Sequence, residues 1–135
     1  MNYLAHDIGF LLAKATQRWN ELLLARFADA GFPEVKGSFG SVLLPLFDDD
    51  GLRIGEIGRR ARLSKPSMTA LIARCEAAGL VRRERDPEDG RAFRVVLTDR
   101  GREFKAVAGD VLRDLNGRVE DRDALIRGLK GVMDL

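Results

Sequence analysis

Two short helix patterns separated by a tight turn, with a basic hairpin directly after them, fill residues 52–97. Ile54, Ile57 and Ala61 have the spacing of a helix of about two turns. After the turn comes Ser64, a favourable helix N-cap. This segment restricts the fold more than any other part of the chain, because each element is short and the next one follows at once.

The second helix pattern carries a complete apolar face. Pro66 is tolerated in its first turn, where backbone N–H groups have no helical partner. Four apolar residues then occupy positions i, i+3, i+4 and i+7, namely Met68, Leu71, Ile72 and Cys75. The run from Ala77 to Gly79 ends this helix, and Leu80 begins a strand.

The hairpin completes the pattern. Phe93, Val95 and Leu97 alternate with Ala92, Arg94 and Val96, as in a half-buried strand. Two short helices followed by a hairpin is the element order of a winged helix-turn-helix. We therefore predict a mainly α-helical protein, with a winged helix-turn-helix over residues 36–98 and a small β-hairpin as its wing.

Long amphipathic helices are predicted on both sides of this region. Residues 3–30 lack Pro and place apolar side chains at helical spacing, which predicts one helix of roughly 40 Å. That length exceeds what a domain of this size can cover by itself. Another helix is expected over residues 36–47, and two more after the hairpin, the first capped by Thr98. Residues 1–31 and 99–135 make up this helical region.

The charge distribution is compatible with a polyanionic partner. Residues 53–105 hold 14 Lys/Arg and 8 Asp/Glu, whereas the whole chain has a net charge of only +2. A basic middle suggests contact with a polyanion, although a solvated charged surface explains the charge equally well. The apolar runs are too short for a membrane span, no signal-peptide pattern is present, and a lone cysteine cannot form an internal disulfide. A cytoplasmic protein is the simplest expectation.

The second helix presents a small and polar side opposite its apolar face. In a helix-turn-helix the N-terminal part of such a helix enters the major groove of DNA. Hydroxyl groups can reach base edges, alanine methyls can meet thymine methyls, and Arg74 can reach phosphate or guanine. An ordinary surface helix with small residues is the alternative. The best contact candidates are Ser64, Lys65, Pro66, Ser67 and Thr69.

Four motifs in residues 63–101 occur together in one known family. They are Leu63, Ser64, Pro66 and Thr69 at the start of the second helix; Gly79, Leu80 and Val81 after it; Asp86, Pro87, Asp89 and Arg91 in the hairpin; and Leu97, Thr98 and Gly101 at the next helix. In this combination the chain resembles the MarR family of bacterial transcription regulators. The helix order agrees with that family over the whole chain.

The resemblance implies a homodimer in which residues 1–31 and 99–135 of two copies intertwine. It implies binding to pseudo-palindromic duplex DNA and action as a repressor. One recognition helix per half-site would enter the major groove, and the wing tips would enter adjacent minor grooves. Arg91 is then the minor-groove arginine, Asp89 would hold it or the tip, and Asp86 with Pro87 would fix the turn.

The arginines around the wing complete the predicted DNA contacts. Those expected on or beside phosphates are Arg82, Arg83, Arg85 and Arg94. The chain departs from the family pattern at Ala70, Ala73 and Gly90, where longer polar or basic residues are common. We therefore expect few direct contacts to base edges and more dependence on DNA shape. A winged-helix module for protein–protein contact is the alternative function.

Other chemistry finds little support in the sequence. Many relatives bind small aromatic or anionic effectors between the helical region and the winged domain, and the candidate residues here are Phe10, Lys14, Trp19, Phe39 and Leu43. Ordinary core packing is the alternative for each of them. Cys75 is expected to be a buried apolar residue rather than a nucleophile, and a small cysteine-dependent enzyme is the third alternative for the function. No cofactor motif, metal-ligand set or catalytic group is recognised, so no enzyme activity is expected.

Overall fold

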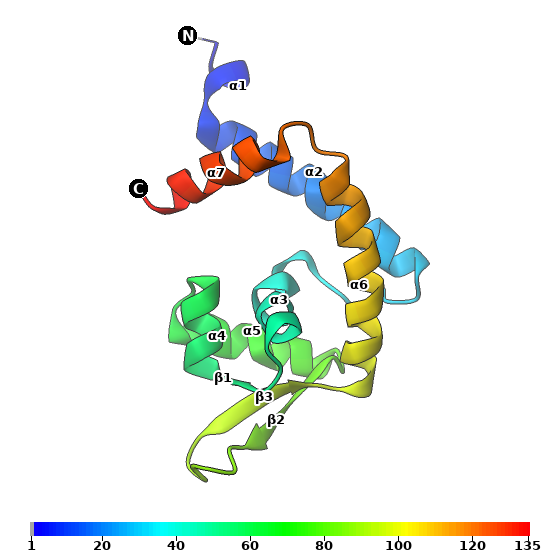
Figure 1. The fold of residues 1–135 in the computed structure, drawn as a ribbon, viewed down its shortest axis with the longest axis vertical. Helices are drawn as coiled ribbons and strands as arrows, with labels where there is room; N and C mark the ends of the chain where they lie inside the picture. The colour runs from blue at the N-terminus through cyan, green and yellow to red at the C-terminus, as the bar shows by residue number, and fades with distance from the viewer. Residues whose placement is uncertain (1) are drawn as a thin grey trace.

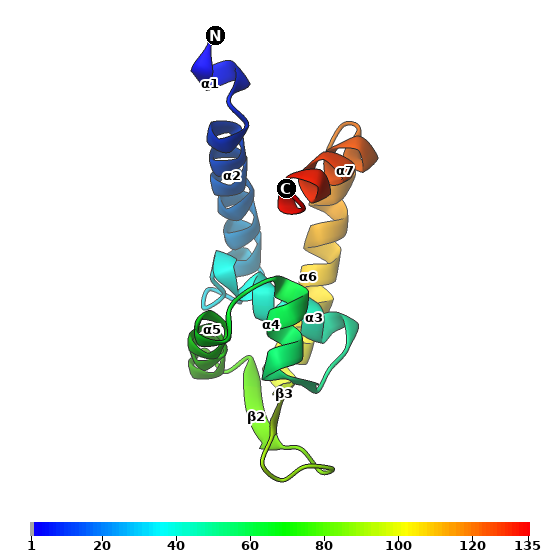
Figure 2. The ribbon, with the colours of Figure 1, turned by 90° about the vertical axis from the view of Figure 1, so that its left-hand side faces the viewer.

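The computed structural model of the protein describes residues 2–135 (Figure 1). A winged region of three helices and a small sheet occupies one end of the molecule, and long helices extend from it to the other end (Figures 1 and 2). The elements are α1 (Tyr3–His6), α2 (Ile8–Asp29), the 3-10 helix η1 (Gly37–Phe39), α3 (Gly40–Asp48), β1 (Leu52–Arg53), α4 (Ile54–Ala61), α5 (Lys65–Ala77), β2 (Val81–Arg85), β3 (Phe93–Leu97), α6 (Asp99–Gly117) and α7 (Arg122–Met133). This order confirms the predicted mainly helical, winged helix-turn-helix fold.

The prediction of one unbroken helix over residues 3–30 is wrong at Asp7. This residue is extended, with φ −77° and ψ 119°, and it separates α1 from α2. Its carboxylate accepts a hydrogen bond from the backbone N–H of Phe10 at 2.8 Å and so caps α2. Aspartate favours such caps because its short side chain competes with the helix for backbone N–H groups.

The sheet has one strand more than the predicted hairpin. Its order is β1-β3-β2, and both pairs are antiparallel. In β1, Leu52 pairs with Val95 and Arg53 pairs with Arg94. A strand of two residues has no alternation that a sequence can display, so only its neighbour β3 reveals it. Because α4 begins at Ile54, directly after β1, this short strand joins the helix-turn-helix to the wing.

One continuous apolar core joins the winged region to the ends of α2 and α6. The predicted face of α5 is confirmed, since all four of its apolar residues are buried. The Phe104 ring of α6 packs edge-on against Phe27 of α2 with centroids 4.8 Å apart. Phe32 lies against the same ring at 5.2 Å. These aromatic contacts fix the two long helices to the winged region.

The start of α6 is held closely against the sheet. Thr98 caps the helix as predicted, because its hydroxyl accepts from the N–H of Gly101 at 3.0 Å. The carbonyl oxygen of Leu80 accepts from the N–H of Thr98 at 3.1 Å. A Cβ placed on Gly101 would lie only 2.1 Å from that same oxygen. Glycine is therefore required at this close approach.

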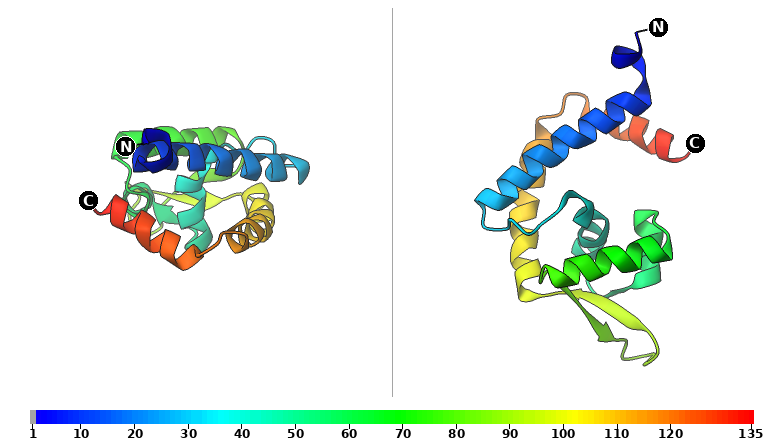
Figure 3. Two further views of the ribbon diagram at one scale, coloured as in Figure 1. Left: turned by 90° about the horizontal axis from the view of Figure 1, so that it is seen from above. Right: turned by 180° about the vertical axis from the view of Figure 1, so that it is seen from behind.

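The far end of the molecule packs quite differently. We call residues 2–18 together with α7 the helical arm, and no side chain of this arm is buried. Its large exposed apolar residues are Tyr3, Leu4, Ile8, Phe10, Leu11, Leu125, Leu129 and Met133. Figure 3 shows the N-terminal helices and α7 at this end, away from the sheet. Among residues 2–135 no helix has both the length and the apolar character needed to cross a bilayer.

Candidate nucleic-acid interface

A tight turn holds α5 at a fixed angle to α4. Arg62 adopts the left-handed conformation at φ 56° and ends α4. Ser64 then caps α5, with its hydroxyl 3.3 Å from the backbone N–H of Ser67 and 3.0 Å from the Ser67 hydroxyl. The predicted N-cap is therefore confirmed. Because its hydroxyl serves the cap, Ser64 is less free for other partners than Ser67.

The outer face of α5 is free of neighbouring elements and carries small side chains. Its exposed residues are Lys65, Pro66, Ser67, Thr69, Ala70, Ala73, Arg74 and Ala77. They include two hydroxyls, three alanine methyls and two cations, and no carboxylate. A surface of this kind permits close approach to a groove, with hydroxyls and methyls near base edges. The face assignment made from the sequence therefore agrees with the exposure of these residues.

The wing loop, residues 86–92, is built around two aspartates. Asp86 accepts at one carboxylate oxygen from the N–H of Glu88 at 2.9 Å. At its other oxygen it accepts from Nε of Arg53 at 2.8 Å. Asp89 accepts from the backbone N–H of Arg91 at 3.1 Å. The carboxylates thus fix the backbone of the loop, and neither is paired with the guanidinium of Arg91.

Arg91 itself projects from this ordered loop without a partner. Among the residues described, no hydrogen bond or ion pair involves its side chain, which is exposed. Arg85 crosses the loop instead, donating to the carbonyl of Gly90 at 2.6 Å and lying 5.3 Å from the ring centroid of Phe93. Because the loop around Arg91 is already fixed, less conformational entropy would be lost if its guanidinium entered a groove of DNA.

Both α5 and the hairpin carry positively charged side chains that no carboxylate neutralises. Within residues 2–135, five cations of α5 and the hairpin have no carboxylate within 4.0 Å: Lys65, Arg74, Arg85, Arg91 and Arg94. Asp86 is the only buried charged side chain of the described chain. The N–H of Glu88, and then the Arg53 guanidinium, hold the pKa of Asp86 below its usual value. The ion pair between Asp86 and Arg53 is therefore kept at neutral pH.

Known proteins share this sequence pattern. A sequence model of the MarR family matches residues 46–92. HTH-type transcriptional regulator TtmR of Methylorubrum extorquens (strain PA1) is 37% identical over 97 residues, or 69% of this chain, and the match spans 50% of TtmR. Transcriptional regulator HosA of Escherichia coli O111:H- is 30% identical over 103 residues, which cover 76% of this chain and 70% of HosA. The chain belongs to the MarR family.

A solved structure agrees in fold with this chain over nearly its whole length. The transcriptional repressor CouR, in complex with a 23-mer DNA duplex, superimposes with a TM-score of 0.77 at 28% identity. The match covers 98% of this chain and 96% of CouR. TtmR and HosA are transcriptional regulators, and CouR is a transcriptional repressor.

Three other DNA-contact candidates of this MarR-family chain contact neighbouring residues or are partly buried. Arg83 pairs with Glu76 of α5 at 3.3 Å, and Arg74 lies 6.0 Å from the ring centroid of Phe39. Nε of Arg94 is buried and has no hydrogen-bond partner. Arg53, which holds the wing loop, was not among the candidates. Only its pairing with Asp86, 33 positions away, identifies it.

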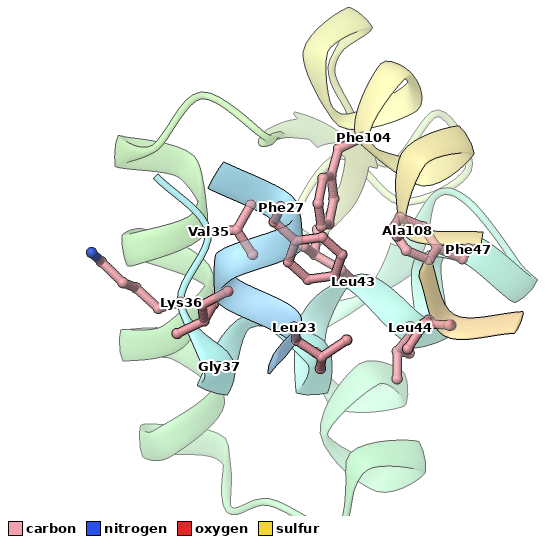
Figure 4. Close-up of a pocket in the computed structure, with 13 residues that line it drawn as sticks. Leu23, Phe27, Val35, Lys36, Gly37, Leu43, Leu44, Phe47, Phe104 and Ala108 are labelled. Carbon is pink, nitrogen blue, oxygen red and sulfur yellow. The ribbon is translucent and has the colours of Figure 1, made fainter. Parts of the chain in front are cut away.

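The predicted effector residues do not converge on one cavity. A cavity of about 60 Å³ lies between α2, α3 and α6 and is lined mainly by Leu23, Leu24, Phe27, Leu43, Phe47 and Phe104 (Figure 4). Of the five candidates only Leu43 lines it, and Phe39 belongs to the core. On the exposed start of α2, Nζ of Lys14 lies 5.7 Å from the ring centroid of Phe10. Trp19 is half-buried. The ammonium group of Lys36 points away from the rings (Figure 4).

Cys75 is an interior residue of α5. It is fully buried, and this burial raises the pKa of its thiol to about 12. A cysteine acts as a nucleophile only when its sulfur is ionised and accessible to a substrate. The sulfur of Cys75 is neither. No group of three metal-binding side chains occurs within residues 2–135.

Proposed function

We propose that this MarR-family chain is a transcriptional repressor that binds pseudo-palindromic duplex DNA as a homodimer. One observation carries the proposal. The carboxylate-free face of α5 and the hairpin, whose loop carries the unpaired Arg91, belong to the same end of the molecule (Figure 2). That combination suits two adjacent grooves of one duplex. CouR, of similar fold, is a repressor that binds a DNA duplex, which supports the same function here.

The parts of the surface have different roles in this proposal. Ser67 and Thr69 contact base edges in the major groove, and the alanines permit their approach. Lys65 and Arg74 contact phosphates, which position the protein without reading sequence. Arg91 enters the minor groove, where narrow A·T-rich segments have a strong negative potential. Few long polar side chains face the bases, so DNA shape contributes much of the specificity.

The helical arm supplies the second copy in this proposal. Its exposed residues Ile8, Leu11, Leu125 and Leu129 form apolar surface that a single chain leaves in water. Burying such surface stabilises association by roughly 25 cal/mol per Å² before entropy costs. Two chains joined through residues 1–31 and 99–135 would present two α5 helices to successive major grooves.

Selection of duplexes from a random DNA pool, followed by sequencing, tests this function directly. We expect an inverted repeat whose half-sites are about one helical turn apart, or a multiple of it. Affinity for the recovered duplex, measured by fluorescence anisotropy, should fall steeply as salt rises, because phosphate contacts release counterions. Absence of any enriched sequence, with no duplex bound even in dilute buffer, would favour the protein–protein module instead.

The cavity supports a second proposal, release of DNA by a small aromatic effector. It lies between α2, α3 and α6, where the long helices meet the winged region. Ordinary ligand sites measure about 300 Å³ or more, so an effector must widen the cavity of about 60 Å³. Gly40 lines it, and a Cβ there would meet nothing closer than 3.8 Å. Gly40→Leu should therefore abolish any thermal shift caused by aromatic carboxylates, and a persisting shift would place their binding elsewhere.

A further inference from the structure

Within residues 2–135, Arg53 is the one side chain outside the hairpin that forms an ion pair with the wing loop. It belongs to β1, the strand that leads into the helix-turn-helix, and its partner in the loop is Asp86. Nε of Arg53 lies 2.8 Å from a carboxylate oxygen of Asp86. The Asp86 side chain is 7% exposed and that of Arg53 is 50% exposed. The acid is thus enclosed, while the guanidinium reaches it from the surface.

Asp86 connects three parts of the structure at once. Its carboxylate receives Arg53 from β1 and the N–H of Glu88 from the turn. Its own backbone N–H donates to the carbonyl of Ala92 at 3.0 Å, across the loop. Arg53 immediately precedes Ile54, the first residue of α4. The ion pair therefore links the start of the helix-turn-helix to the base of the loop that carries Arg91.

We propose that Arg53, through Asp86, sets the position of the Arg91 guanidinium relative to the reading helix α5. Arg53 is a positioning residue in this proposal, which rests on the DNA-binding function proposed above. A hairpin attached only by its two strands can pivot about its base. The extra bond restricts that motion, so less ordering is needed when the wing enters a groove. Wing contact and helix contact then occur at a fixed separation along the duplex.

A direct phosphate contact by Arg53 is the competing explanation, because half of its side chain is exposed. Asp86→Asn separates the two. The amide oxygen can still accept from Glu88, and removal of a negative charge favours DNA binding in general. A positioning role predicts weaker binding for Asp86→Asn, whereas a phosphate contact predicts unchanged or tighter binding. Only the positioning role thus predicts a loss of DNA affinity in Asp86→Asn.

The experiment measures anisotropy with the duplex recovered by selection, for Arg53→Met, Asp86→Asn and the control Arg59→Met. Arg59 is an exposed arginine of α4 that pairs with Glu56 and does not touch the wing. We expect both Arg53→Met and Asp86→Asn to bind about three- to tenfold more weakly, and the control to lose less than about twofold. In an Arg91→Ala background both effects should fall below about twofold, because the positioned group is gone.

A second measurement does not require DNA. Amide hydrogen exchange at Glu88 and Ala92 should quicken in Asp86→Asn and Arg53→Met but not in Arg59→Met, with melting temperatures close to the parent value. Arg53→Lys replaces Arg53→Met if the latter does not fold, since lysine keeps the charge but lacks Nε. Tight binding by Asp86→Asn, or undiminished effects in the Arg91→Ala background, overturns the inference alone. A parent protein that binds no selected duplex overturns the proposed function, and the inference with it.

Discussion

The winged region, residues 36–98, and the helical arm read alike in sequence but differ in packing. Both consist of amphipathic segments with apolar residues at helical spacing. In α5 all four apolar positions are buried, whereas α7 buries none. The winged region therefore completes its core within one chain. The arm presents a similar pattern with nothing to cover it.

This difference shows what periodicity can and cannot reveal. Apolar spacing predicts which face of a helix is buried in the functional assembly, but not which chain buries it. Leu46 of α3 is 0% exposed and Leu129 of α7 is 37% exposed. One of these leucines already contributes to the stability of the folded chain, and the other can do so only through a further contact.

The largest expected effect is on the junction that completes the winged core. Gly101→Ala places a methyl 2.1 Å from the backbone oxygen of Leu80, which cannot move without disturbing the sheet. We expect a loss of about 4 kcal/mol or more in the free energy of unfolding, measured by urea denaturation. The matched control is Gly109→Ala on the same helix, where only the Arg113 side chain is near, at 3.4 Å. A mild response to Gly101→Ala would disprove the close contact.

A pair of identical substitutions sharpens the comparison. Leu46→Ala should destabilise the protein by about 3 kcal/mol, because it leaves a cavity in a closed core. Leu129→Ala should cost less than about 1 kcal/mol in dilute protein but weaken association of two copies, measured by sedimentation equilibrium. Equal costs in dilute protein, with association unchanged, would mean that the arm is buried by its own chain.

Arg91→Ala separates function from stability inside the winged region. We expect DNA affinity to fall by about 1–3 kcal/mol, the range of a specific base-edge contact, in anisotropy measurements. The melting temperature should not change, since the side chain has no partner within the described structure. Arg113→Ala on α6 makes the same charge change away from α5 and the wing and serves as the control. Unchanged affinity for Arg91→Ala would remove the role given to the wing.

The smallest effect concerns an ion pair of the winged region and depends on pH. Arg59 and then Arg60 lower the pKa of Glu56 from 4.5 to about 2. Because the folded pKa lies below the unfolded one, the stabilisation is present above pH 4.5 and disappears as the pH falls towards 2. Glu56→Gln should thus lower the urea midpoint slightly at neutral pH and not near pH 2. A difference of the same size at both values would contradict the assignment.

Local signals were the ones that sequence could predict. Ser64 and Thr98 cap their helices through contacts three residues away, and the apolar faces of α5 and α6 follow from spacing. Pairings between distant segments were not predictable. The strand β1 exists only because β3 lies beside it, and Arg53 meets Asp86 only once that strand has formed.

The same limit applies to the candidate site. The outward face of α5 was predicted because one helix contains the whole pattern. The effector candidates come from α2, η1 and α3, and their convergence depends on how those elements pack. Asp7 shows a local failure, because a capping residue ended a helix that apolar spacing alone would have continued.

The interior location of Cys75 has a practical consequence for labelling this protein with a fluorescent dye. Burial encloses its sulfur and raises the pKa of its thiol to about 12, so we expect maleimide reagents to leave it unlabelled. A dye attached through Gly90→Cys, where an added Cβ meets nothing within 4 Å, would label the wing loop alone. Fluorescence could then follow that loop in real time, with no need to remove the natural sulfur first.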